Sequence, residues 1–220
     1  MSHFISLKTR FDQHNGSDSS LSRVERKPTW GTCAGLILLA ESANRTKKGG
    51  QELIGGLDVR VNRNHFGRQI ESFQANLDLP FLRSSSSFAS PSSAIESTSE
   101  DPFRAIFIRA PIVEKLLPHA QDEQEAEAKT ENTVIAPSRT VDREKVPSFT
   151  LGDVEVMAKL PGRTAALSEE TKEKLDEEAG DIIAVRQSNV FGTSFHPELT
   201  GDARIHVWWL EQVIAVVEGR

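Results

Sequence analysis

The sequence predicts an α/β protein, and three features of the 220-residue chain carry that prediction. Residues 31–35 (GTCAG) have the glycine-flanked form of a nucleophile elbow, a sharp turn from a strand into a helix. Residues 54–61 alternate in the manner of a strand, and residues 104–109 form a second strand pattern bounded by Pro102 and Pro111. Residues 203–217 space their apolar side chains along one helical face. Strands and helices are therefore expected within one chain.

The remaining elements follow from the same patterns. Residues 34–41 (AGLILLAE) predict a mostly buried helix directly after the elbow. Residues 154–158 predict a third strand, and residues 182–186 and 190–195 predict a hairpin through Ser188 and Asn189. The terminal helix is expected to present Ile205, Trp208, Trp209, Val213 and Val216 on its apolar face. Residues 169–178 are charged all round and predict a short exposed helix or a loop.

The domain organisation is predicted from composition. Residues 1–27 are polar and without a clear period, so we interpret them as a disordered or unrelated leader. Residues 28–220 form the predicted domain. Two loop insertions are expected within it, near 84–100, where nine serines occur, and near 121–148, where the chain is acidic and polar.

Composition excludes several classes of protein. The net charge of −6 and the isoelectric point near 5.6 argue against a nucleic-acid partner. No apolar run approaches the roughly 20 residues of a membrane span, and no secretory signal is seen. One cysteine cannot form an internal disulfide or a thiolate zinc cluster, and it fits a reducing compartment. A cytoplasmic protein is expected.

The only cysteine, Cys33, lies at the centre of the elbow. A cysteine attacks as thiolate, so it needs a lowered pKa or a neighbouring base. The helix that begins at Ala34 is expected to favour negative charge on the sulfur through its dipole. The ordinary alternative for a lone cysteine is a small buried hydrophobe. The flanking glycines favour the nucleophile, because they suggest backbone packed too closely for a Cβ.

Far downstream, His196 and Glu198 flank Pro197. His196 is expected to take the thiol proton and later return it to a leaving amine, while Glu198 holds the imidazole in the required tautomer. The ordinary alternative for His196 is a surface or satisfied core histidine. The other five histidines have no ligand-like spacing, so neither a metal site nor a cofactor is expected.

Four segments, in order, resemble the glutaminase subunit of pyridoxal 5′-phosphate synthase. They are residues 29–40 (TWGTCAGLILLA), 63–69 (RNHFGRQ), 107–111 (FIRAP) and 192–200 (GTSFHPELT). A generic class I glutamine amidotransferase shares only the elbow and the His-Pro-Glu. The resemblance covers residues 28 to about 217.

The resemblance implies a flavodoxin-like, three-layer α/β/α glutamine amidotransferase domain. It implies hydrolysis of L-glutamine to glutamate and ammonia, with the ammonia passed to a barrel-shaped synthase subunit that builds the vitamin B6 ring. Cys33 matches the nucleophile, and His196 and Glu198 match the relay pair. Substrate-binding positions are matched by Arg63, Ile108 and Arg109; an arginine suits the substrate α-carboxylate, because guanidinium binds carboxylate in a bidentate fork.

The chain departs from this family in its first part. Family members begin with a strand and a Leu-Gln-Gly segment, followed by a strand ending in Pro-Gly-Gly-Glu-Ser, and neither occurs here. The second of these normally helps to bind glutamine and supplies an oxyanion donor, which leaves the N–H of Ala34 as the expected donor. We therefore expect an amino-terminally truncated form that lacks at least two strand-helix units, on the order of 50 to 60 residues.

Two further functions stay open from the sequence. One is a catalytically impaired remnant that still binds the synthase or binds nothing. The other is a related cysteine hydrolase of the same fold, such as a peptidase or another amidotransferase.

Overall fold

The computed structural model describes residues 27–44, 51–63, 72–83, 101–117, 133–136, 152–160 and 182–219. Residues 1–26 of the predicted leader, the serine-rich segment 84–100 and the charged segment 169–178 lie outside these ranges. Within them, no helix has the length and apolar character needed to cross a membrane.

Eight strands form the main sheet, and its order is β1-β10-β9-β6-β3-β2-β7, with β8 also paired to β9. The strands are β1 (Thr29–Thr32), β2 (Ala40–Asn44), β3 (Leu57–Asn62), β6 (Ile112–Leu116), β7 (Thr133–Ile135), β8 (Glu155–Lys159), β9 (Ile182–Gln187) and β10 (Val190–Thr193). The pairs β1–β10 and β2–β3 are parallel, and the other pairs are antiparallel. The sheet is therefore mixed.

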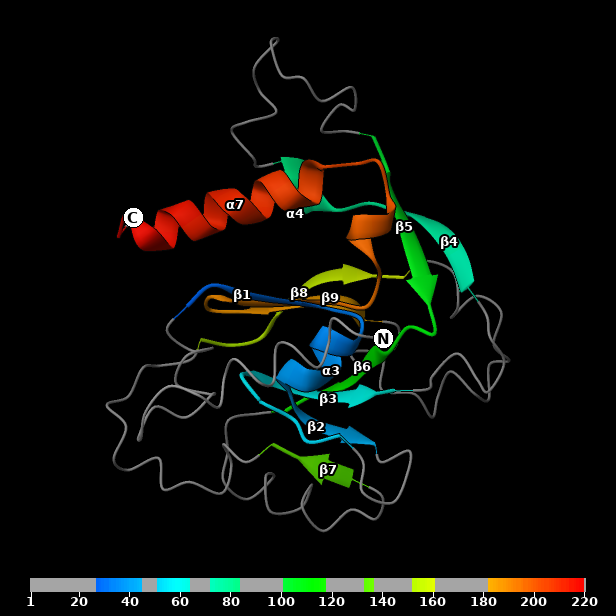
Figure 1. Ribbon diagram of the computed structural model, residues 1–220, viewed down its shortest axis with the longest axis vertical. Helices are drawn as coiled ribbons and strands as arrows, with labels where there is room; N and C mark the ends of the chain where they lie inside the picture. Colours follow the sequence, from blue (N-terminus) through cyan, green and yellow to red (C-terminus); the bar gives the residue numbers. More distant parts are fainter. Residues whose placement is uncertain are drawn as a thin grey trace.

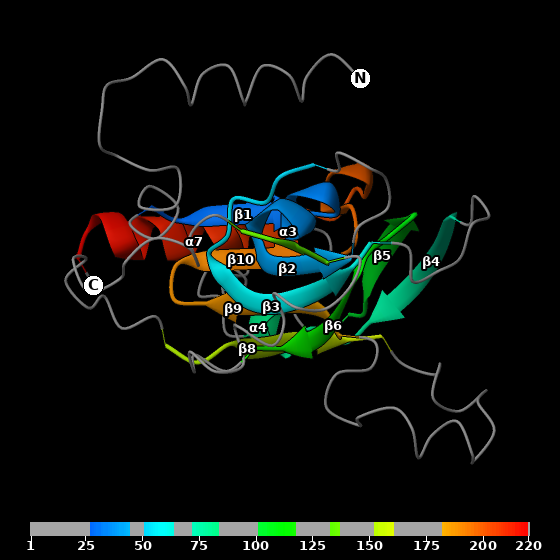
Figure 2. The same ribbon diagram turned by 90° about the horizontal axis from the view of Figure 1, so that it is seen from below.

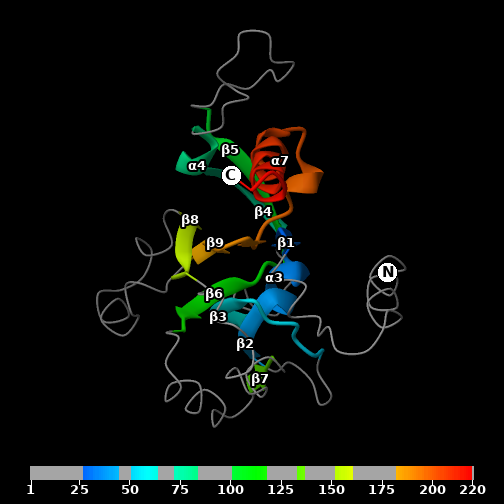
Figure 3. The ribbon, with the colours of Figure 1, turned by 90° about the vertical axis from the view of Figure 1, so that its left-hand side faces the viewer.

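A separate two-stranded sheet joins β4 (Ser72–Leu77) to β5 (Phe103–Ile108) in antiparallel register. It lies on the same side of β1 and β9 as the terminal helix (Figure 3). The alternating burial of β5, with Phe103, Ala105 and Phe107 buried, directs every second side chain into the core. The intervening residues face outward, toward the elements that follow β10.

Helices cover both faces of the main sheet, and this makes three layers (Figure 1). Helix α3 (Ala34–Leu39) packs with Leu57, Val59 and Val190 on one face, and Figure 2 shows it over the strands nearest to it in sequence. Helix α7 (Arg204–Val217) packs with Phe191 on the opposite face, together with the short helix α4 (Pro80–Arg83). The α/β class is confirmed, and the layering agrees with the predicted three-layer fold.

An aromatic cluster joins α7 to the edge of the sheet. The ring of Trp30 on β1 lies 5.4 Å from that of Phe191 on β10, which lies 5.0 Å from Trp208 on α7. Phe191 is fully buried, and burial of a side chain of this size contributes roughly 2 to 3 kcal/mol. The cluster therefore anchors β1, the strand that leads into the elbow.

The predicted hairpin is confirmed. Strand β9 turns at Ser188 and Asn189 into β10, with Gln187 opposite Val190. Ser188 has φ 53°, as a tight turn requires. The predicted terminal helix is also confirmed, with Ile205 and Trp208 buried, whereas Val216 on its expected apolar face is 44% exposed.

The helix predicted for residues 34–41 is shorter than expected. It ends at Leu39, and Ala40 is already extended, with ψ 145°. The residues that follow enter β2, where they gain sheet hydrogen bonds from both β3 and β7. Buried Glu41 accepts a hydrogen bond from the N–H of Gly56 at 2.9 Å. Tertiary pairing therefore overrides the helical pattern from Ala40 onward.

Part of the segment predicted as a solvated insertion, residues 121–148, belongs to the sheet. Its described residues are 133–136, and they form β7 and end on buried Ala136. The N–H of Ala136 donates to the carbonyl of Glu41 at 2.9 Å. The sequence did not reveal this strand, because three residues are too few to establish a period against acidic neighbours.

Candidate active site

Cys33 lies between β1 and α3 with φ 48° and ψ −103°. A non-glycine residue rarely adopts a positive φ, so this backbone is strained. Its N–H donates to the carbonyl of Thr193 on β10 at 2.7 Å, and its own carbonyl accepts from the N–H of Ile37 at 3.3 Å. The sheet on one side and the helix on the other hold the strained residue in place. This geometry is that of the elbow predicted from the sequence.

The two glycines of the elbow have different roles. A Cβ on Gly31 would lie 2.5 Å from the carbonyl carbon of Gly35 and 2.7 Å from a methyl carbon of Leu39. A Cβ on Gly35 would meet no atom within 4 Å. The steric explanation offered for both glycines therefore holds at Gly31 and is wrong at Gly35. Only Gly31 lets β1 and α3 approach closely.

Gly192 on β10 is a second position of close approach, which the sequence argument did not identify. A Cβ there would lie 2.6 Å from a methyl carbon of Leu36 and 3.0 Å from one of Leu57. A glycine inside a strand pattern is the available signal for such an approach. It allows α3, and with it Cys33, to lie against β10.

His196 and Glu198 form a direct pair. Nδ1 of His196 lies 2.7 Å from Oε1 of Glu198, and Pro197 begins the 3₁₀ helix η5 (Pro197–Leu199) that carries the carboxylate. With a carboxylate on Nδ1, the imidazole keeps its proton there and leaves Nε2 as the basic nitrogen. The imidazole is largely buried, whereas the Glu198 side chain is 49% exposed. The carboxylate therefore orients the ring while it stays in contact with solvent.

The outer edge of β5 connects the two halves of the site. The carbonyl of Ile106 accepts the backbone N–H of His196 at 2.8 Å. The carbonyl of Ile108 accepts the Cys33 thiol, with Sγ 3.8 Å from the oxygen. Residues two apart on a strand are separated by about 6.6 to 6.8 Å. Cys33 and His196 are therefore brought to neighbouring positions on one edge.

The Cys33 thiol donates its hydrogen bond to the carbonyl of Ile108 and not to the imidazole of His196. Between the described residues, the structure gives no hydrogen bond from Cys33 to His196. The pKa of the Cys33 thiol is raised above its ordinary value of 9.0, chiefly by burial, with a further contribution from the negative charge of Glu198. The backbone N–H of Ala34 acts in the opposite direction and lowers this pKa. The expected lowering by α3 is thus outweighed, because the helix is short and the sulfur is partly desolvated.

The predicted substrate-binding residues are placed at two strand ends. Arg63 follows β3; its N–H donates to Oδ1 of Asn44 at 2.7 Å, and Nη2 donates to the carbonyl of Gln51 at 3.2 Å. Nε of Arg63 is buried and makes no hydrogen bond within the described structure, and burial lowers the pKa of this guanidinium. Arg109 follows β5, is exposed and has φ 45°. Ile108 reaches Cys33 through its carbonyl.

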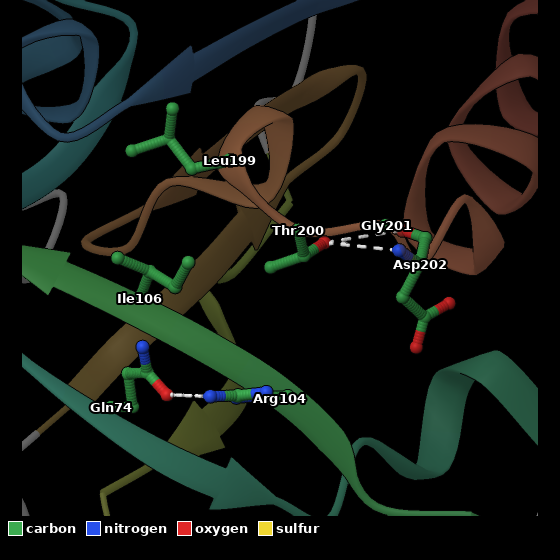
Figure 4. A pocket seen from close by; sticks show the side chains of 7 residues that line it. All are labelled: Gln74, Arg104, Ile106, Leu199, Thr200, Gly201 and Asp202. Carbon is green, nitrogen blue, oxygen red and sulfur yellow. Dashed lines mark hydrogen bonds between the residues drawn. The ribbon is translucent and has the colours of Figure 1, made fainter.

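An open pocket lies between β5 and the segment that ends η5 and follows it (Figure 4). Its volume is about 460 Å³, and its lining consists of Gln74, Arg104, Ile106, Leu199, Thr200, Gly201 and Asp202. Cys33 is not part of the lining. Across the described ranges, no group of three or more histidine, cysteine, aspartate or glutamate side chains is arranged to hold a metal ion.

A strained cysteine on a strand-to-helix elbow, beside a histidine that is paired with a carboxylate, is an arrangement typical of cysteine-dependent amidotransferases and hydrolases of the α/β class. Residues 17–149 and 140–215 match the SNO glutamine amidotransferase family. The chain belongs to this family.

The similar proteins are named as pyridoxal 5′-phosphate synthase subunits. A probable subunit PDX2 of Arabidopsis thaliana is 35% identical over 199 residues, covering 88% of this chain and 60% of that protein. A probable subunit pdx2 of Dictyostelium discoideum is 36% identical over 187 residues, covering 84% of this chain and 55% of that protein. Subunit PdxT of Herpetosiphon aurantiacus is 33% identical over 187 residues, covering 85% of this chain and 63% of that protein. The chain thus spans about 60% of the length of these relatives.

Among solved structures, one described as a glutamine amidotransferase is 29% identical to this chain. The match covers 87% of this chain and 64% of that protein's chain, with a TM-score of 0.49.

Proposed function

We propose that this protein is a glutaminase, which hydrolyses L-glutamine to glutamate and ammonia. The observation that carries the proposal is the juxtaposition of Cys33 and the His196–Glu198 pair on one edge of β5. The family to which the chain belongs supports glutamine as the substrate.

In the proposed reaction, Nε2 of His196 takes the thiol proton and the sulfur of Cys33 attacks the side-chain amide carbon of glutamine. The N–H of Ala34 is the donor for the developing oxyanion. The C–N bond breaks, the histidine returns the proton to the leaving ammonia, and glutamate remains bound to sulfur as a thioester. Water then hydrolyses the thioester, releasing glutamate and restoring the thiol.

Glutamine is proposed to lie between the ends of β3 and β5, against Arg63, Ile108 and Arg109. The buried Nε of Arg63 supports this placement, since an unpaired buried guanidinium N–H is costly unless a ligand accepts it. A substrate α-carboxylate is a fitting acceptor. The exposed side chain of Arg109 offers a second cation at the end of β5.

The ammonia is proposed to pass to a barrel-shaped pyridoxal 5′-phosphate synthase subunit, which uses it to build vitamin B6. The names of the similar proteins support this partner. We place the reaction in the cytoplasm, on the grounds of one unpaired cysteine and an acidic composition.

A second candidate is a catalytically impaired form that binds the synthase without turnover. The raised pKa of Cys33 and the hydrogen bond from its thiol to Ile108 favour this alternative, because both keep the sulfur protonated. The proposed reaction has the N–H of Ala34 as its one oxyanion donor. Loss of a single oxyanion donor typically lowers the catalytic rate by about 10² to 10³. A related cysteine hydrolase is the third candidate.

The test is ammonia release from glutamine by the purified chain, alone and with excess synthase subunit, beside Cys33→Ala. Release that depends on Cys33 and rises with the partner supports the glutaminase. Absence of release from a chain that is folded by circular dichroism supports the impaired form. Labelling of Cys33 by a glutamine analogue, but not by a peptide analogue, separates a glutaminase from a peptidase.

A further inference from the structure

Thr193, at the end of β10, holds the strand that leads into the elbow at two points. Its backbone carbonyl accepts the N–H of Cys33 at 2.7 Å. Its hydroxyl oxygen accepts the indole N–H of Trp30 at 3.2 Å. Trp30 lies on β1, a short distance before Cys33 in the chain. One fully buried residue of β10 therefore bonds to both ends of the segment 30–33.

The indole of Trp30 is fixed from the side of α7. Its ring centroid lies 5.4 Å from that of Phe191 and 5.4 Å from that of His206. The ring of Trp209 lies 5.9 Å away. Phe191 and Thr193 are two residues apart on β10, so their side chains share the face that α7 covers. The Trp30–Thr193 hydrogen bond is therefore made within a packed aromatic cluster.

This bond contributes to the alignment of β1, because β1 has few other partners. Among the described strands, β1 lies at the edge of the main sheet and pairs with β10 alone, over four residues. An edge strand receives ladder hydrogen bonds on one side only. A side-chain bond between β1 and β10 close to the elbow therefore supplements a short ladder.

Cys33 needs this alignment because its backbone is strained. A residue with φ 48° and ψ −103° keeps that conformation where its surroundings over-determine it. The bond from its N–H to Thr193 is one such constraint, and the bond from Trp30 holds Thr193 against β1. Without the Trp30 bond the elbow is freer to relax, and the sulfur then leaves the Ile108 carbonyl, which it contacts at 3.8 Å.

We propose that Thr193 is a positioning residue for the nucleophile. Through its hydroxyl and the indole of Trp30, it keeps Cys33 in the strained elbow, with the sulfur at the edge of β5. The same edge binds the backbone of His196. The part of Thr193 in glutamine hydrolysis rests on the proposed function, whereas its hold on the sulfur does not depend on the substrate.

Substitutions at both ends of the hydrogen bond test this role. Thr193→Val removes the acceptor at nearly constant shape, Thr193→Ser retains it, and Trp30→Phe removes the donor. Trp209→Phe is the matched control, since it removes an indole from the same aromatic cluster and leaves the Trp30–Thr193 bond in place. Because Cys33 is the only cysteine in the chain, its alkylation by iodoacetamide reports on the sulfur alone.

Thr193→Val and Trp30→Phe are expected to alkylate roughly two- to tenfold faster than the unsubstituted chain at neutral pH, which is the change in local opening that loss of one hydrogen bond produces. The midpoints of their pH profiles should be lower, because burial raises the pKa of the Cys33 thiol and the relaxed elbow exposes it. Thr193→Ser and Trp209→Phe should keep the original rate and midpoint. Glu198, whose charge also raises this pKa, is unchanged in every variant.

Three measurements separate positioning from a loss of overall stability. The alkylation rates should not vary with dilute urea, because a local opening exposes little surface, whereas global unfolding would make them rise steeply. The double variant of Trp30→Phe with Thr193→Val should alkylate no faster than the faster single variant, because both substitutions remove the same bond. With the synthase subunit, Thr193→Val should lower kcat for ammonia release and change KM little, because the sulfur moves and the glutamine-binding residues do not.

Equal alkylation rates and pH midpoints for folded Thr193→Val and Thr193→Ser would overturn the positioning role. Additive effects in the double variant, or rates that follow global unfolding in urea, would overturn it as well. Where Thr193→Val does not fold, the comparison of Trp30→Phe with Trp209→Phe decides.

Ammonia release by the unsubstituted chain with the synthase subunit is measured in parallel, so that the two proposals can fail separately. The predicted alkylation pattern without any release supports the positioning role and rejects the glutaminase. Release together with identical alkylation rates in all variants rejects the positioning role and leaves the glutaminase standing.

Discussion

Oε1 of Glu198 lies 2.7 Å from Nδ1 of His196, across the single residue Pro197. The proline begins a 3₁₀ helix, which turns the chain sharply enough for two side chains only two positions apart to meet. The pair is therefore built by local backbone, and the fold places it beside Cys33.

Replacement of Glu198 by glutamine should change two properties in opposite directions. Ammonia release should fall about 10²-fold or more, because the imidazole loses the charge that orients it and stabilises the imidazolium. Alkylation of Cys33 near neutral pH should become faster, because the charge of Glu198 raises the thiol pKa. The control is Glu155→Gln, at an exposed position of β8. Parallel loss of both rates would indicate a misfolded site and contradict this assignment.

The two elbow glycines provide a matched pair for a stability test. Gly31→Ala should lower the free energy of unfolding by about 2 kcal/mol, since its Cβ would overlap the backbone of Gly35. Gly35→Ala should raise it by up to about 1 kcal/mol, because space is open there and alanine favours the helix. Denaturant unfolding of both variants measures the difference. Similar effects at the two positions would refute the close approach of β1 and α3.

The buried Arg204 at the start of α7 should be a major contributor to stability. Its side chain is 1% exposed, contacts both carboxylate oxygens of Asp202 and donates to the carbonyl of Asp101 at 2.7 Å. Asp202→Ala should lower the free energy of unfolding by about 3 kcal/mol, because it leaves a buried cation without its partner. The exposed pair Arg83 and Asp78 is the control, and Asp78→Ala should cost less than about 1 kcal/mol. Equal losses of unfolding free energy in Asp202→Ala and Asp78→Ala would show that burial of the arginine does not determine how much its ion pair stabilises the fold.

Stability should decrease at alkaline pH through Cys33. Its pKa in the folded chain is raised above the ordinary value of 9.0, so the folded state holds the proton more tightly than the unfolded state. The resulting stabilisation is complete below about pH 9 and is lost as the pH rises through the folded pKa. The measurement compares unfolding free energies of the unsubstituted chain and Cys33→Ala from pH 7 to pH 11. A difference between them that does not vary with pH would contradict the raised pKa.

Several features of the fold could be predicted because their signals are local. The hairpin through Ser188 and Asn189 and the amphipathic helix after residue 203 each bring their own turn or period. Strand β7 and the early end of α3 could not, since both depend on pairing partners far away in sequence. The candidate nucleophile and relay pair were predictable from glycine, proline and charge spacing.

By itself the sequence determined which residues carry the candidate chemistry, namely Cys33 between glycines and His196 two positions from Glu198. It also determined that His196 and Glu198 contact each other, because the local backbone around Pro197 is enough to bring their side chains together. Tertiary structure alone decided that Gly31 and not Gly35 is the close approach, that β5 aligns the thiol with the histidine, and that the thiol donates to Ile108. These outcomes depend on packing and desolvation by segments far apart in the chain, which no local pattern of residues encodes.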